Sequence, residues 1–111
     1  MREPTYFILA ALQDEPLHGY AIITRAGELS QGRVRLATGT LYAALERLTG
    51  EGYVRSGREE IVNGRARRYY TLTTDGRAAL RAEAAAMAAA ARIVTDHPAR
   101  SAALRPAAGL S

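Results

Sequence analysis

The 111-residue sequence contains no cysteine and no lysine, and histidine occurs only twice. Without cysteine there is no disulfide, thiol nucleophile or thiolate metal site, and two distant histidines, His18 and His97, exclude a histidine-rich metal centre. No apolar run reaches the roughly 18 residues of a membrane-spanning helix, and the N-terminus lacks the pattern of a signal peptide. We therefore expect a cytoplasmic protein with no metal, no cofactor and no membrane partner.

The motifs of catalysis are also missing. The sequence has no phosphate-binding glycine loop, no nucleophile elbow and no metal-binding spacing. Asp75 and Glu83 are interpreted as first-turn and surface charges of a helix rather than as a catalytic pair. We therefore predict that the protein is not an enzyme.

The residues that are abundant indicate one basic globular domain. Hydrophobic residues make up 48% of the chain, and 15 basic against 11 acidic residues leave a formal charge of +4. The chain is too apolar for a disordered protein, and its length fits one compact domain. Every basic residue is arginine, which suits phosphate and guanine contacts, although a GC-rich genome also favours a lysine-free chain. The positions of the arginines therefore carry more information than their number.

Three helices are predicted in the first half of the chain. The first begins at Pro4 and is broken by Pro16; because it is apolar on every side, we expect it to be shared between two chains. The second runs from about residue 18 to 30. The third has Thr38 as its N-cap and ends before Gly52. The apolar stripe predicted for the second helix is Tyr20, Ile22, Ile23, Ala26 and Leu29.

The third helix has one apolar face and one small polar face. Leu41, Leu45 and Leu48 recur at helical spacing and predict a buried stripe. Just before this helix, residues 33–36 alternate polar and apolar and predict a very short strand with its arginines outward. The complementary face of the helix consists of Thr40, Ala43, Glu46 and Arg47, with Tyr42 at its flank.

A β-hairpin follows the third helix. Residues 53–61 and 65–72 have the two-residue period of strands, and Asn63-Gly64 between them is typical of a type I′ turn. This turn sets the register and places Arg65 at the tip of the hairpin. The expected cross-strand pairs are Val62–Arg65, Ile61–Ala66, Glu60–Arg67 and Glu59–Arg68.

A long fourth helix is predicted from a cap at Thr73 or Thr74 to about Asp96. Its apolar residues have heptad spacing, which favours packing against the same helix of a second chain. We divide the chain into a domain over residues 1–73, a dimerisation helix over 74–96 and a flexible tail over 97–111. The heptad seam consists of Leu80, Ala84, Met87, Ala91 and Val94.

This order of elements predicts a winged helix-turn-helix, a mainly α fold with a small β-hairpin, followed by a long C-terminal dimerisation helix. In this fold the third helix lies in the major groove of DNA, and the hairpin, or wing, reaches along the backbone or into the minor groove. Double-stranded DNA is therefore the expected partner.

Four segments of the sequence resemble the PadR family of bacterial transcriptional regulators, with a likeness that covers roughly residues 4–95. The His-Gly-Tyr and Gly-Thr-Leu-Tyr elements are specific in this order and spacing. Thr38 and Ala43 depart from the pattern, because proline is common at both positions. The segments are Leu17-His18-Gly19-Tyr20, Gly39-Thr40-Leu41-Tyr42-Ala43-Ala44-Leu45, Gly52-Tyr53-Val54, and Gly64-Arg65-Ala66-Arg67-Arg68-Tyr69-Tyr70-Thr71-Leu72-Thr73 with Gly76.

The resemblance implies a homodimeric repressor of the short subfamily, with a single C-terminal helix. Members bind pseudo-palindromic operators, often upstream of detoxification, efflux or their own genes. Many release DNA when a small hydrophobic or phenolic effector binds. The resemblance also implies that Tyr42 contacts DNA, most simply at a phosphate.

The candidate DNA-binding residues lie around the third helix and in the wing. Arg65 has no acidic partner across the turn, so a DNA contact is favoured over simple solvation. For Thr40 we favour DNA over a capping role. Arg67 and Arg68 face glutamates, so pairing within the wing and contact with DNA are both open. The full set is Arg35, Thr38, Gly39, Thr40, Tyr42, Arg65, Arg67 and Arg68.

A homodimer interface is predicted along residues 77–95, with the first helix of each chain packed against the fourth helix of the other chain. The resemblance further implies an effector pocket, which we expect beside this seam with Tyr6, Phe7 and Met87 as candidate residues. The net charge of only +4 leaves open a rival function, a winged helix that binds protein rather than DNA. The predicted interface residues are Tyr6, Ile8, Leu80, Ala84, Met87, Ala91 and Val94.

Overall fold

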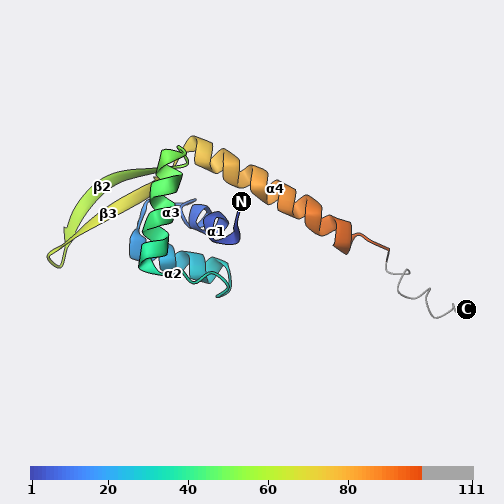
Figure 1. Cartoon of the computed structure of the whole chain (residues 1–111), viewed down its shortest axis with the longest axis horizontal. Helices are drawn as coiled ribbons and strands as arrows, with labels where there is room; N and C mark the ends of the chain where they lie inside the picture. The colour runs from blue at the N-terminus through green and yellow to red at the C-terminus, as the bar shows by residue number, and fades with distance from the viewer. Residues whose placement is uncertain (99–111) are drawn as a thin grey trace, which may run out of the picture.

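The computed structural model describes residues 1–98, which form four helices and one three-stranded antiparallel sheet (Figure 1). The helices α1 to α3 and the base of the sheet make a rounded body. Strands β2 and β3 project from it on one side and α4 on the other (Figure 1). The predicted winged helix with a long C-terminal helix is confirmed. The elements are α1 (Glu3–Ala11), β1 (Leu17–His18), α2 (Gly19–Leu29), α3 (Thr38–Gly50), β2 (Val54–Val62), β3 (Arg65–Leu72) and α4 (Thr74–Thr95).

Helix α1 lies in the centre of the hydrophobic core. Ile8 and Leu9 have no exposed surface, and Leu12, just after the helix, is 2% exposed. The expectation that α1 is apolar because two chains share it is wrong for these side chains, since residues of the same chain already surround them. Their partners in the core include Ile22, Leu41, Leu45, Leu48, Val54, Tyr70, Leu72 and Leu80.

Helices α2 and α3 form the helix-turn-helix, and Ser30 holds the turn between them. Its buried hydroxyl donates to the carbonyl oxygen of Gly27 (3.2 Å) and accepts from the backbone N–H of Val34 (2.9 Å). Gln31 and Gly32 have φ angles of 56° and 84°, the left-handed conformation that reverses the chain here.

The strand predicted over residues 33–36 does not form. These residues run as an irregular segment into α3, and the free edge of β3 is occupied instead by Leu17 and His18, which pair with Tyr70 and Tyr69. The sheet order is therefore β1-β3-β2. Since β1 consists of only two residues, its pairing depends on the position of β3 rather than on a local sequence pattern.

The hairpin has the predicted turn and register. Asn63 and Gly64 have φ angles of 52° and 77°, as a type I′ turn requires, and each of the four expected cross-strand pairs is present. The pairing is irregular between Ser56 and Glu59, where β2 carries one residue more than β3. Strands β2 and β3 extend together beyond the helices of the body (Figure 1), and Arg65 follows directly after their turn.

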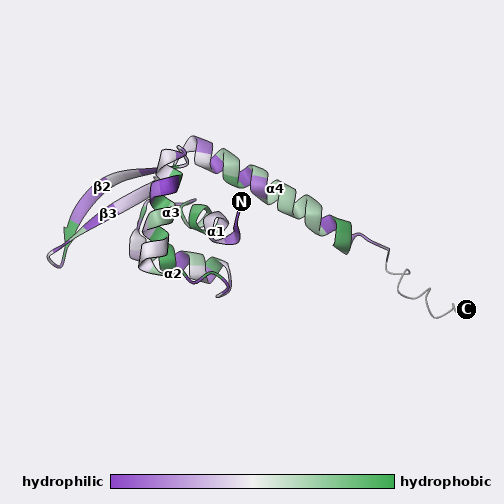
Figure 2. Cartoon of the chain, in the orientation of Figure 1, coloured by the Kyte–Doolittle hydropathy of each residue, from purple (hydrophilic) through white to green (hydrophobic). Residues whose placement is uncertain are grey.

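Helix α4 begins against the body and then leaves it. The Thr73 hydroxyl accepts from the backbone N–H of Gly76 (2.9 Å) and donates to the carbonyl of Gly52 (2.6 Å), which confirms Thr73 as the N-cap. A Cβ at Gly76 would collide with the carbonyl of Tyr53, so glycine permits this close start. Leu80 is the last buried residue of the described chain, and beyond it the apolar side chains of Met87, Ile93 and Val94 are 45–75% exposed (Figure 2).

None of the helices within residues 1–98 is long and apolar enough to cross a bilayer. Of the predicted flexible tail, residues 99–111 lie outside the described residues.

Candidate nucleic-acid interface

Helix α3 presents an exposed face because its three leucines are buried on the other. Leu41, Leu45 and Leu48 are at most 1% exposed. The helix begins one residue earlier than expected: Ala37, in an extended conformation, is the N-cap and Thr38 is the first helical residue. The prediction that Thr38 caps the helix is therefore wrong. No side chain caps this end of α3, so its first-turn N–H groups, together with Thr38, Gly39 and Thr40, lie exposed where an anion would be favoured.

Tyr42 lies between α3 and the sheet. Its ring centroid is 6.5 Å from that of Tyr70, and its hydroxyl lies so close to Gly19 that a Cβ there would collide with it. Even so, 45% of Tyr42 remains exposed. The pKa of the Tyr70 hydroxyl is raised, mainly because the group is partly buried and to a smaller extent because Tyr42 lies nearby. Tyr42 can therefore pack on the sheet and still contact an external ligand.

The arginines of the wing differ in their surroundings. Arg65, at the tip, is exposed and forms no ion pair within residues 1–98. Arg68 is held by Glu59, with 3.1 Å between Nη2 and Oε2. Glu60 instead accepts a hydrogen bond from the Tyr69 hydroxyl (2.8 Å), so it faces Arg67 without an ion pair.

The pairing of Arg68 does not remove it from the interface. Its side chain and that of Glu59 are each half exposed, and such surface pairs are typically worth less than about 1 kcal/mol. Exchange of this glutamate for a phosphate would therefore cost little. The structure thus explains Arg68 by pairing in the free chain but leaves Arg67 available.

A hollow of about 390 Å³ separates the wing from the start of α2. It brings together residues from β1, α2, α3 and β3. Its lining includes His18, Tyr20, Tyr42, Arg65, Arg67 and Arg68. All six side chains can donate a hydrogen bond, and the three arginines carry a positive charge, so the hollow suits an anionic partner.

Tyr20 and His18 are the residues of this hollow that sequence reasoning missed. Tyr20 and Leu29 were both expected in the apolar stripe of α2, but Tyr20 is 74% exposed and Leu29 is 39% exposed. Ile22 and Ala26 of the same stripe are fully buried. Residues 20 and 22 lie about 200° apart around a helix, so the periodicity itself could have placed Tyr20 outside.

His18 packs edge-on against Tyr69, with 5.7 Å between ring centroids. Burial is the main cause that lowers the pKa of His18 below 6.5; the positive charge of Arg67 lowers it further and Glu60 opposes the shift. The neutral ring of His18 is therefore favoured at pH 7, and His18 is a packed residue that also borders the hollow. No cluster of three or more potential metal ligands occurs in the part of the chain that the structure describes.

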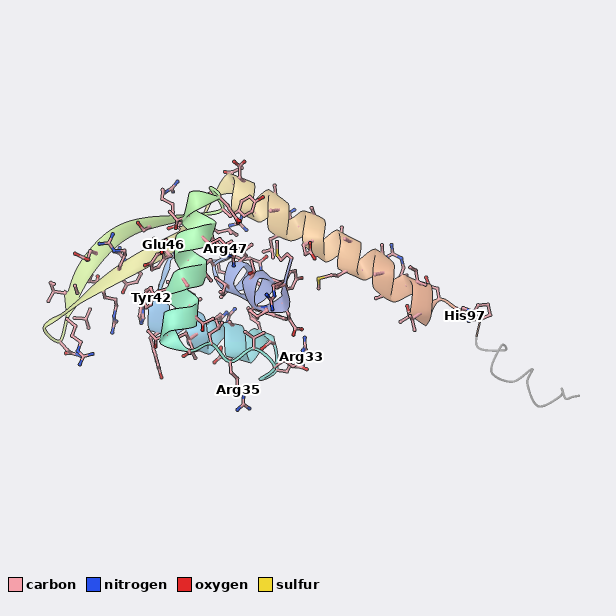
Figure 3. All side chains as sticks on the ribbon, viewed as in Figure 1. Arg33, Arg35, Tyr42, Glu46, Arg47 and His97 are labelled. Carbon is pink, nitrogen blue, oxygen red and sulfur yellow. The ribbon has the colours of Figure 1, made fainter. Side chains whose placement is uncertain are left out.

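The arginines before α3 are placed differently from each other (Figure 3). Arg33 pairs with Glu3 at 2.8 Å and lies over the ring of Phe7, at 5.8 Å from its centroid. Arg35 donates to the carbonyl of Gly32 (3.2 Å) and forms no ion pair within residues 1–98. Arg35 is therefore the one more available for a ligand.

The predicted interface residues fall into two groups. Ile8 is fully buried in its own chain, so it offers no surface to a second copy and its assignment to an interface is wrong. Leu80 is 4% exposed and packs into the same core. Ala84 is half-buried and Ala91 exposed, while Met87 and Val94 are 45% and 75% exposed.

The residues proposed for an effector pocket lie on two helices. Tyr6 and Phe7 are half-buried neighbours on α1, with rings edge to face at a centroid distance of 5.2 Å. Met87 lies on the projecting part of α4. The described chain does not by itself enclose a site between these three side chains.

Residues 8–82 match the sequence profile of the transcriptional regulator PadR-like family. The chain is 42% identical over 87 residues to "Transcriptional regulator Rv3488" of Mycobacterium tuberculosis, an alignment that covers 78% of each protein. PadR of Bacillus subtilis, solved in complex with operator DNA, is similar with a TM-score of 0.63 and 30% identity, over 72% of this chain and 46% of that one. A PadR family regulator of Clostridium difficile shares the fold, with a TM-score of 0.71 and 22% identity, over 86% and 97% of the two chains.

Proposed function

The chain belongs to the PadR-like family of transcriptional regulators, which are DNA-binding proteins and not enzymes, and from this premise we propose that it is a homodimeric repressor. It binds a pseudo-palindromic operator in double-stranded DNA, in the cytoplasm, and a small hydrophobic or phenolic effector releases it.

The observation that carries operator binding is that the first turn of α3 and the wing are both exposed, while Tyr42 of α3 lines the same hollow as the wing arginines. The exposed first turn of α3 suits the major groove, and the wing tip suits the adjacent backbone or minor groove. The Bacillus subtilis relative was solved with operator DNA bound, and its 30% identity supports the transfer of this activity to the chain.

We assign different roles to the helix and the wing. Thr38, Gly39 and Thr40 approach base edges and phosphates at the start of α3, and Tyr42 contacts a phosphate from its flank. The arginines Arg35, Arg65, Arg67 and Arg68 supply most of the affinity through the backbone. Phosphate contacts fix the position of the protein, whereas contacts to base edges determine its sequence preference.

Dimerisation through α4 would present two such surfaces to one duplex. Ala84, Met87, Ala91 and Val94 follow heptad spacing and are small or substantially exposed, which supports a helix-to-helix seam. A spacing of about 34 Å between the recognition helices, or a multiple of it, would match successive turns of DNA. An effector near Tyr6, Phe7 and Met87 would act by favouring dimers with a different spacing.

A mobility-shift titration tests this proposal most directly. The probe is duplex DNA from immediately upstream of the protein's own gene, with a scrambled duplex of equal length and composition as the control. We expect preferential binding of the upstream DNA and a steep loss of affinity between two salt concentrations, because phosphate-bound cations are released when arginines bind. Equal, salt-independent affinity for both duplexes would instead favour a protein-binding winged helix.

A further inference from the structure

The outward face of α3 carries few groups that can distinguish bases. Gly39, Ala43 and Glu46 recur at i, i+4 and i+7, opposite the buried leucines, and all three are exposed. Gly39 has no side chain, and the methyl group of Ala43 has no hydrogen-bonding atom. Glu46 is therefore the one of these three residues with a side chain that can hydrogen-bond to a base.

Glu46 is also free of the contacts that hold its charged neighbours. Arg47 donates to the Thr5 hydroxyl (3.0 Å) and lies 3.8 Å from the carboxylate of Glu51. Arg68 is paired with Glu59. The Glu46 side chain makes no hydrogen bond or ion pair with any other residue from 1 to 98.

The position of Glu46 points it toward the same partner as Tyr42. The two residues are one helical turn apart and line a hollow of about 280 Å³ at the base of the wing. Figure 3 shows both on the wing side of α3, whereas Arg47 lies on the side of α1. Glu46 is about 9 Å further along the helix axis than Thr40, far enough to face a different base pair.

A carboxylate in this position can only accept hydrogen bonds, and phosphates repel it. In the major groove the available donors are the N4 amino group of cytosine and the N6 amino group of adenine. The adenine amino group lies beside the N7 acceptor, which repels a carboxylate, whereas the cytosine amino group lies beside a C–H. Cytosine is therefore the base that Glu46 can accept from at the smallest cost.

We propose that Glu46 determines specificity by accepting a hydrogen bond from the N4 amino group of a cytosine in each operator half-site. This inference rests on the proposed DNA-binding function and deepens it, because it names a base and the residue that recognises it. The competing explanation is that Glu46 acts only as a negative charge that weakens binding to every sequence alike.

Selection from a pool of randomised duplexes distinguishes the two explanations, with the wild type, Glu46→Ala and Glu46→Gln compared. We expect a cytosine in each half-site for the wild type, with a roughly tenfold loss of affinity when that C·G pair is replaced. Glu46→Ala should bind both duplexes equally. Glu46→Gln should shift the preference at this position toward adenine, because glutamine matches its N6 and N7 groups.

Glu51→Gln is the matched control, since it removes the same charge near the same helix on the α1 side. It should leave the selected sequence unchanged. An unchanged motif in Glu46→Ala, with binding to all duplexes strengthened as in Glu51→Gln, would overturn the inference and leave the proposed function intact. If the wild type enriches no duplex at all, the proposed function fails and the inference fails with it.

Discussion

Helix α4 passes through two regions of the molecule with opposite environments. Its first turns belong to the body, residues 1–80, where Gly76 and Leu80 are buried against the sheet and α1. Its remainder, residues 81–95, forms a rod in which Met87, Ile93 and Val94 are 45–75% exposed (Figures 1 and 2). One continuous helix is thus stabilised by packing at one end and by little more than the helix propensity of alanine at the other.

This contrast indicates that different parts of the chain stabilise the fold and the proposed dimer. The body forms a buried hydrophobic core without help from another chain, and this core accounts for its own stability. The rod gains little from its own chain, and its exposed apolar residues would be stabilised by a second copy. The surface proposed to contact DNA lies in the body, and the seam proposed to space two copies lies in the rod.

The largest effect is expected from a cavity in the body. Leu41→Ala removes a fully buried side chain and should lower the free energy of unfolding by about 2–5 kcal/mol, measured by chemical denaturation. Ala89→Gly in the exposed rod is the comparison, and it should leave unfolding of the body unchanged. Equal destabilisation by both substitutions would show that body and rod unfold as one unit.

A charge in the seam should change assembly while the body stays folded. Met87→Glu should convert the dimer to a monomer, because an unpaired carboxylate would be buried between two helices. Sedimentation velocity measures the change, and Ala89→Glu, on the opposite side of the helix, should remain dimeric. If Met87→Glu still sediments as a dimer, the proposed seam is wrong.

A smaller effect is expected at the wing tip. Arg65→Ala should weaken binding to all duplexes roughly fivefold near 0.15 M salt, because one phosphate contact changes the salt slope by about 0.9. Fluorescence anisotropy at several salt concentrations measures both quantities. Arg25→Ala, which removes an exposed arginine of α2 paired with Asp14, is the control and should change neither. A loss confined to one sequence would contradict a phosphate role.

The smallest effect concerns the pH dependence of the body. Because burial and Arg67 lower the pKa of His18 below 6.5, folding favours the neutral ring. His18 therefore contributes stability above pH 6.5 that is lost as the pH falls below this value. The melting temperature of His18→Gln should decrease less than that of the wild type between pH 7.5 and 5.5. An equal decrease in both proteins would show that other groups cause it.

Local sequence signals predicted several elements in detail. The Asn63-Gly64 turn set the register of the whole wing, because both positions need positive φ, and Thr73 was one of two expected caps for α4. Contacts between distant segments could not be predicted from local sequence signals. Examples are the pairing of residues 17–18 with β3 and the hydrogen bond from Tyr69 to Glu60. Both form between elements that meet only after folding.

The candidate site was predicted unevenly for the same reason. Arg65, Thr40 and Tyr42 were found from the turn, the helix and the family resemblance, and the structure leaves all three exposed. Tyr20 was missed because its aromatic ring was counted as part of an apolar stripe. The strand register places a glutamate opposite both Arg67 and Arg68. It therefore could not predict that only Arg68 forms an ion pair with the facing glutamate.

The hairpin turn with its register, the Thr73 cap of α4 and the family followed from the sequence, because each depends on residues only a few positions apart or on a short ordered motif. Which side chains are buried, which arginines remain unpaired and which face α3 leaves open were decided only by the tertiary structure. These properties depend on distances between segments far apart in the chain, and those distances exist only once the core has packed.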